Sequence, residues 1–131
     1  MLINLLLYLL WLYTGIIIIK FLEGRDHLST DDLMVIQNEL WDARSKWRNI
    51  GIQLQMKIAD LEAIGEKNSN VPDNCFTDCI TTWLRQTNPS PTWTALIKAL
   101  RSSPVGFQEM AKRLERKFLQ PFLTDNQVHY Y

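Results

Sequence analysis

Three tryptophans constrain this chain more than any other feature, because each lies on an apolar stripe with helical spacing. They are Trp47, Trp83 and Trp93. Aliphatic residues follow Trp47 and Trp93 one and two turns later, on the same face of the predicted helix. The three stripes also succeed one another at short intervals. A chain with this pattern is expected to fold as a bundle of short helices around a shared aromatic core.

The first apolar stripe is too long for one helix of a globular domain. It recurs at steps of three and four residues from residue 33 to residue 64, after the helix start Ser29-Thr30-Asp31-Asp32. Since a single helix over 31–65 would be unusual, we predict breaks near 44–46 and near 55–57, and therefore three packed helices. The stripe consists of Leu33, Ile36, Leu40, Ala43, Trp47, Ile50, Leu54, Ile58, Leu61 and Ile64.

The second half of the chain predicts three further helices. The loop over 66–74 leads to a helix capped by Asp73 or Asn74, which ends at Asn88-Pro89. Ser90-Pro91 and Ser103-Pro104 each predict a serine cap followed by proline at the first helical position. No segment alternates with period two, so we expect an all-α protein. The predicted inner faces are Phe76, Cys79, Ile80 and Trp83, then Trp93, Leu96, Ile97 and Leu100, then Phe107, Met110, Ala111, Leu114 and Phe118.

The first residues form an uncharged apolar segment. Residues 2–19 would span about 27 Å as a helix, close to the hydrocarbon thickness of a bilayer. We therefore predict a membrane-spanning or signal-anchor helix over residues 1–22, followed by a short linker over 23–28. Lys20 and Arg25 after the span favour a cytosolic location for the C-terminal part of the chain. Two alternatives remain, a cleaved signal peptide and an incidental start of a truncated chain.

Composition argues against several functional classes. Basic and acidic residues number 14 each, so bulk charge does not predict binding to nucleic acid. Cys75 and Cys79, one helical turn apart, are expected to be reduced core residues, since a disulfide at this spacing would strain the helix. With His27 and His129 near opposite ends, we predict neither a zinc site nor a cofactor. Phosphate loops and nucleophile motifs are absent from the sequence, and we predict no enzyme.

The order of the tryptophan motifs resembles the death domain, over about residues 28–118. Trp47 with Ile50, Gly51 and Leu54 is similar to the family's second helix. The residues Cys79, Ile80, Trp83 and Leu84 resemble the fourth helix of the death-domain family. Pro91-Thr92-Trp93 with Leu96-Ile97 and Ala99-Leu100 resembles the start of its fifth, and Val105-Gly106 with Met110-Ala111 and Leu114-Glu115 resembles its sixth. The resemblance implies a six-helix antiparallel Greek-key bundle over 29–119. Residues 120–131 lack a periodic pattern, so we expect a loose C-terminal tail there.

What the resemblance implies for function is homotypic assembly in intracellular signalling, for example in cell death or inflammation. The partner would be another death-domain protein or a second copy, with no small-molecule substrate. With the N-terminal helix, this predicts a single-pass membrane protein whose death domain lies in the cytoplasm, or a cytoplasmic protein if that segment is incidental. The alternative is an unrelated helical bundle whose tryptophans fill its core, and in either case the tryptophans are structural. The predicted core comprises Trp47, Leu54, Leu61, Trp83, Trp93, Leu96, Leu100 and Leu114.

Charge is distributed unevenly along the chain, which gives independent support for assembly. Residues 25–78 hold ten acidic and six basic residues, whereas residues 79–120 hold two acidic and seven basic. A module of this kind can dock head to tail on a copy or a relative. The candidate acidic face is Asp31, Asp32, Asp60, Glu62 and Glu66, and the candidate basic face is Arg85, Lys98, Arg101, Lys112 and Arg113. The alternative is that the basic C-terminal helices bind nucleic acid or another partner.

Overall fold

The computed structural model describes residues 2–119, with the side chains of residues 3–14 and 26–119. Every regular element in that part of the chain is helical, and the only pairing of β type described there is an isolated bridge between His27 and Thr92. The all-α prediction is therefore confirmed. The predicted tail over 120–131 lies outside the described residues.

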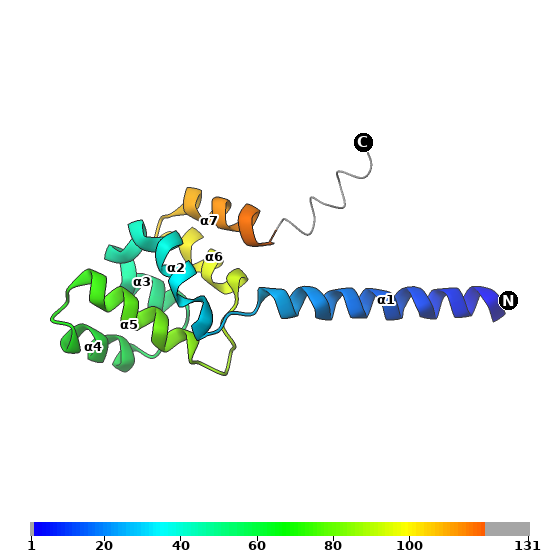
Figure 1. Cartoon of the computed structure of the whole chain (residues 1–131), viewed down its shortest axis with the longest axis horizontal. Helices are drawn as coiled ribbons and strands as arrows, with labels where there is room; N and C mark the ends of the chain where they lie inside the picture. The colour runs from blue at the N-terminus through cyan, green and yellow to red at the C-terminus, as the bar shows by residue number, and fades with distance from the viewer. Residues whose placement is uncertain (1, 120–131) are drawn as a thin grey trace.

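Seven α-helices follow one another along the described chain. Figure 1 shows α2 to α7 gathered into one body, from which α1 projects as a single rod. The helices are α1 (Leu2–Asp26), α2 (Leu33–Leu40), α3 (Trp47–Gln53), α4 (Ile58–Lys67), α5 (Pro72–Leu84), α6 (Trp93–Arg101) and α7 (Gln108–Leu114). Two 3₁₀ segments, η1 (Thr30–Asp32) and η2 (Trp41–Lys46), and a π turn, η3 (Glu115–Leu119), complete the order.

Both predicted breaks in the first stripe are confirmed. The 3₁₀ segment η2 separates α2 from α3, and residues 54–57 separate α3 from α4. The second break is a tight turn in which Gln55 has a φ of 63° and the Met56 amide donates to the Gly51 carbonyl at 3.0 Å. Gly51 also allows α4 to approach α3 closely, since a Cβ there would lie 2.5 Å from Leu61 Cδ2.

The helix starts agree with the sequence in one case and differ in three. Ser29 and Asp32 form the predicted cap, with the Ser29 amide donating to Asp32 Oδ2 at 2.8 Å. The Asp73 or Asn74 cap is wrong, because α5 already begins at Pro72, in the first position where a missing N–H costs nothing.

The two predicted Ser-Pro starts are also wrong. The Pro91 carbonyl accepts the Leu28 amide at 3.0 Å, which keeps this residue in an extended connection. Thr92 caps α6 instead, as its Oγ1 accepts the Ala95 amide at 3.1 Å. After Ser103, the chain turns through Gly106 (φ 76°) before α7 begins.

The core is built from the stripes that the sequence displays. All eight predicted core residues are buried, and among the residues of the predicted stripes Leu33, Phe107 and Phe118 are half-buried. Ile58 is a correction, because its side chain is 50 % exposed at the start of α4. Cys75 and Cys79 are free and fully buried, as predicted.

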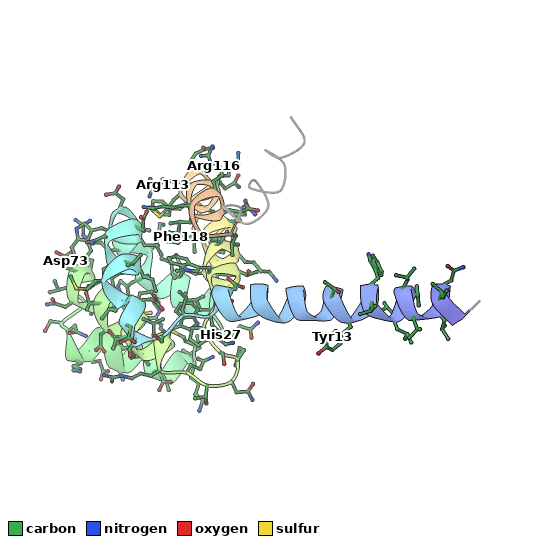
Figure 2. The ribbon with its side chains drawn as sticks, turned by 45° about the vertical axis from the view of Figure 1, so that its right-hand side comes forward. Tyr13, His27, Asp73, Arg113, Arg116 and Phe118 are labelled. Carbon is green, nitrogen blue, oxygen red and sulfur yellow. The ribbon has the colours of Figure 1, made fainter. Side chains whose placement is uncertain are left out.

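The helix α1 continues to Asp26, so the first part of the segment predicted as a linker is helical. Its end is fastened to α6, where Thr94 donates to Asp26 through its amide (3.0 Å) and its hydroxyl (2.7 Å). Large apolar side chains between Ile3 and Tyr13 are exposed, and Tyr13 lies well away from the body (Figure 2). Among the described residues, no helix combines the length and the apolarity that crossing a membrane requires.

Candidate partner-binding surface

The interior of the described part of the chain contains no group of polar side chains. No charged or polar residue is buried there, and no cluster of His, Cys, Asp and Glu side chains among the described residues could hold a metal ion. Any site in this part of the chain must therefore be sought on its surface.

The buried thiols are chemically quiet. Burial, and next the negative charge of Asp78, raise the pKa of the Cys79 thiol from its ordinary 9.0 to about 12, and the pKa of Cys75 is raised by the same causes. The Cys79 thiol donates to the Trp47 carbonyl at 3.7 Å, and its sulfur lies 3.6 Å from Met56 Sδ. Both cysteines therefore act as core residues between α5 and the helices beside it.

The five predicted acidic residues do not form one face. Asp31 and Asp32 belong to η1, whereas Asp60, Glu62 and Glu66 lie on α4, and α5 runs between α2 and α4 (Figure 1). Asp32 is occupied by the cap of η1. Glu62 lies 3.8 Å from Arg48, with both side chains exposed.

The predicted basic residues divide into paired and unpaired groups. Arg101 pairs with Glu115, Lys112 lies 3.6 Å from Glu109, and Arg113 donates to the Glu39 carbonyl at 3.1 Å. Arg85, at the end of α5, and Lys98, on α6, are exposed and form no ion pair with any described carboxylate. Of the five predicted basic residues, only these two form no ion pair with a described carboxylate and so keep their full charge available for a partner.

A surface groove runs between the α3–α4 turn and the α5–α6 connection. It consists of two hollows of about 430 and 470 Å³, which share Gln55 and Pro89. Lys57 and Arg85 line the first hollow, and Lys98 lines the second. We call this the basic groove. Asp60, predicted on the opposite face, also lines the first hollow, so the two predicted faces meet here.

Lys57 was not among the residues predicted to bind a partner, although its position was informative. It precedes α4 as the N-cap residue, and it too forms no ion pair with a described carboxylate. A basic residue beside a positive helix end is not placed there for helix stability. A lysine at the N-terminus of a predicted helix was therefore the sequence signal that could have identified Lys57 as a candidate binding residue.

A second surface feature missed by the sequence reasoning surrounds Trp41. Its ring meets Phe76 edge-on, with centroids 6.2 Å apart, and Arg44 lies 4.7 Å above it. Arg44 Nε also donates to Asp73 Oδ1 at 2.7 Å. Trp41 is 37 % exposed and was not part of the predicted apolar stripe.

Comparison of the chain with protein-family models, with characterised proteins and with solved structures finds no match.

Proposed function

We propose that this protein is a death-domain-like interaction module that assembles with another module of its kind, or with a second copy, in intracellular signalling. Support comes from the ordered tryptophan motifs and from their use in the helical body. Trp47, Trp83 and Trp93 are 7 %, 2 % and 6 % exposed, so they maintain the fold and leave recognition to the surface. The Greek-key arrangement of the six helices α2 to α7 is part of this proposal.

The observation that carries the proposal is the unpaired charge on that surface. Lys57, Arg85 and Lys98 line a groove, while Asp31 and Glu66 are exposed elsewhere and have no ion-pair partner among the described residues. Opposite charges displayed on different parts of one module favour head-to-tail association and raise its rate.

We further propose that α1 tethers the module to a membrane, with the helical body in the cytoplasm. The exposed apolar side chains of residues 3–14 favour a lipid environment, because an exposed apolar surface of this extent is unfavourable in water. Protease treatment of sealed vesicles checks this topology. The body should be cleaved from the cytosolic side, and its protection there would contradict the proposed orientation.

Nucleic-acid binding is the weaker candidate. The five residues that could have formed a basic patch are Arg101, Lys112, Arg113, Arg116 and Lys117. Arg116 forms no ion pair with a described carboxylate, but the other four already lie against carboxylates. A phosphate backbone would have to displace those contacts before it gained the full charge of these residues. The assembly proposal requires no such exchange.

The proposal is tested by binding the full-length chain, kept soluble in mild detergent, to a panel of isolated death domains and to itself. Saturable binding to at least one death domain or to itself, weakened at high ionic strength, is expected. If the chain binds none of them and instead binds duplex DNA with a steep salt dependence, the nucleic-acid alternative replaces the proposal.

A further inference from the structure

The basic groove holds three cations and one carboxylate, that of Asp60, and none of the three cations forms an ion pair with a described carboxylate. Seven described basic side chains lie within ion-pair distance of a carboxylate, yet none of the three that line the groove does. The three cations come from segments far apart in the sequence, so the fold itself brings them together. They are Lys57 before α4, Arg85 after α5 and Lys98 on α6.

The groove also has the shape of a docking site. Its two hollows are joined through Gln55, which the turn with φ 63° places at the rim, and through Pro89 of the α5–α6 connection. Polar side chains dominate the first hollow, including Gln86, Thr87 and Asn88. A partner that binds here should present carboxylates to Lys57, Arg85 and Lys98, because hydrogen bonds between charged groups are the strong ones.

The middle and the far end of α4 carry carboxylates that suit this groove. Glu62 and Glu66 are four residues apart, so they project from the same face of the helix. Both are exposed; Glu62 faces Arg48 only loosely, and Glu66 has no described ion-pair partner. Together they present two negative charges on one turn of helix.

Within one molecule, no ion pair joins a cation of the groove to Glu62 or Glu66. Glu62 lies five residues after Lys57, or about 7.5 Å along the helix axis, and Glu66 lies near the far end of this helix of 10 residues, which is about 15 Å long. An ion pair requires contact within a few ångströms. The two charged sites are therefore complementary only between molecules, in a head-to-tail contact that repeats from copy to copy.

We propose that the basic groove binds the Glu62–Glu66 face of α4 of a second copy of this chain. This inference rests on the proposed assembly function and names the surfaces that carry it. Because each copy offers both surfaces, the contact leaves a free groove at one end and a free carboxylate pair at the other. Assembly can then continue beyond a dimer, as a ring or as an open chain.

The experiment compares full-length variants in mild detergent by sedimentation velocity at low and high ionic strength. The groove variant carries Lys57→Glu and Arg85→Glu, and the partner variant carries Glu62→Lys and Glu66→Lys. The control, Lys46→Glu with Arg116→Glu, makes the same charge change outside the groove; Figure 2 shows Arg116 on the C-terminal part of the body, beside Arg113. Circular dichroism verifies the fold of each variant, and Arg85→Gln removes charge without placing an acid at the end of α5.

We expect self-association of the wild-type chain at low ionic strength, weakened about tenfold or more in the groove variant and little changed in the control. Arg85→Gln should weaken it less than the reversal does. A mixture of the groove and partner variants should recover association that each variant lacks alone.

Three results would overturn the inference in distinguishable ways. If the wild-type chain associates but the groove variant and the control behave alike, this groove is not the contact, and the assembly proposal stands. If the wild-type chain associates neither with itself nor with any death domain, both proposals fail. Association only with an acidic surface of a different protein would also overturn the choice of a second copy as the occupant.

Discussion

Trp93 and Phe118 stack face to face, with ring centroids 4.1 Å apart and planes inclined by only 8°. Trp93 opens α6, whereas Phe118 lies in η3 beyond α7 (Figure 2). Lys117 beside it pairs with Glu39, which also accepts from Arg113. The segment η3 therefore packs against α6 through Phe118 and is bound to the end of α2 through Lys117.

Replacing Phe118 with Ala should weaken the attachment of η3 to α6. The half-buried ring contributes apolar contact and aromatic stacking, so we expect a loss of roughly 1–2 kcal/mol in the free energy of unfolding. Urea denaturation monitored by tryptophan fluorescence measures it. Phe118→Leu, which keeps an apolar contact without stacking, should lose less. Equal stability of Phe118→Ala and the wild type would show that η3 does not support the body.

Trp83 should matter more than Phe118 because its ring is almost completely buried at 2 % exposure. We expect Trp83→Ala to lower the free energy of unfolding by about 3–5 kcal/mol, since the substitution leaves a large cavity. Thermal unfolding followed by far-ultraviolet circular dichroism checks this value. An unchanged melting curve would show that Trp83 does not stabilise the core. It would also weaken the resemblance to the death domain, which depends on the tryptophan motifs.

Cys79 predicts a specific dependence of stability on pH. Its pKa is raised to about 12 in the folded chain, so the buried thiol stays protonated when the same thiol ionises in the unfolded chain. This contribution to stability is fully present below the unfolded pKa and is lost as the pH rises from there towards about 12. Cys79→Ser should show a shallower fall over that alkaline range, after the neutral-pH cost of the substitution is subtracted. Parallel curves would contradict the assignment.

The tie between α1 and α6 depends on Asp26. Asp26→Ala removes the carboxylate that accepts from both the amide and the hydroxyl of Thr94, and it should cost about 1 kcal/mol, as the loss of a helix cap does. Hydrogen exchange at the Thr94 amide should accelerate. Asp26→Asn keeps an acceptor oxygen and should retain part of the protection. Unchanged exchange in Asp26→Ala would mean that the carboxylate does not hold this amide.

Much of the helical body could be predicted from spacing, because burial imposes the period of the helix on the sequence. The stripe that includes Ile36, Leu40 and Ile50 marked the inner faces directly. Helix starts were predicted less well, since the Pro91 carbonyl is bound by Leu28 from a distant segment. Nothing local in the sequence reports such a contact.

The sequence showed which charged residues the chain contains, but it could not predict where they lie on the surface or which of them form ion pairs. Asp60 and Arg85, assigned to opposite faces, line one hollow, and Arg113 is drawn to Glu39 by tertiary packing. Which charges remain unpaired depends on these long-range contacts. The segregation of charge along the chain therefore led to the proposal of assembly but could not locate the groove.

The central claim, assembly through complementary charge, is tested most directly by sedimentation equilibrium of the full-length chain in mild detergent, over a range of protein concentration and ionic strength. We predict a mass that rises with concentration at low ionic strength and falls towards that of one copy as salt is added, because exposed charges are then screened. A mass of one copy at every concentration, or an assembly indifferent to salt, would contradict this claim.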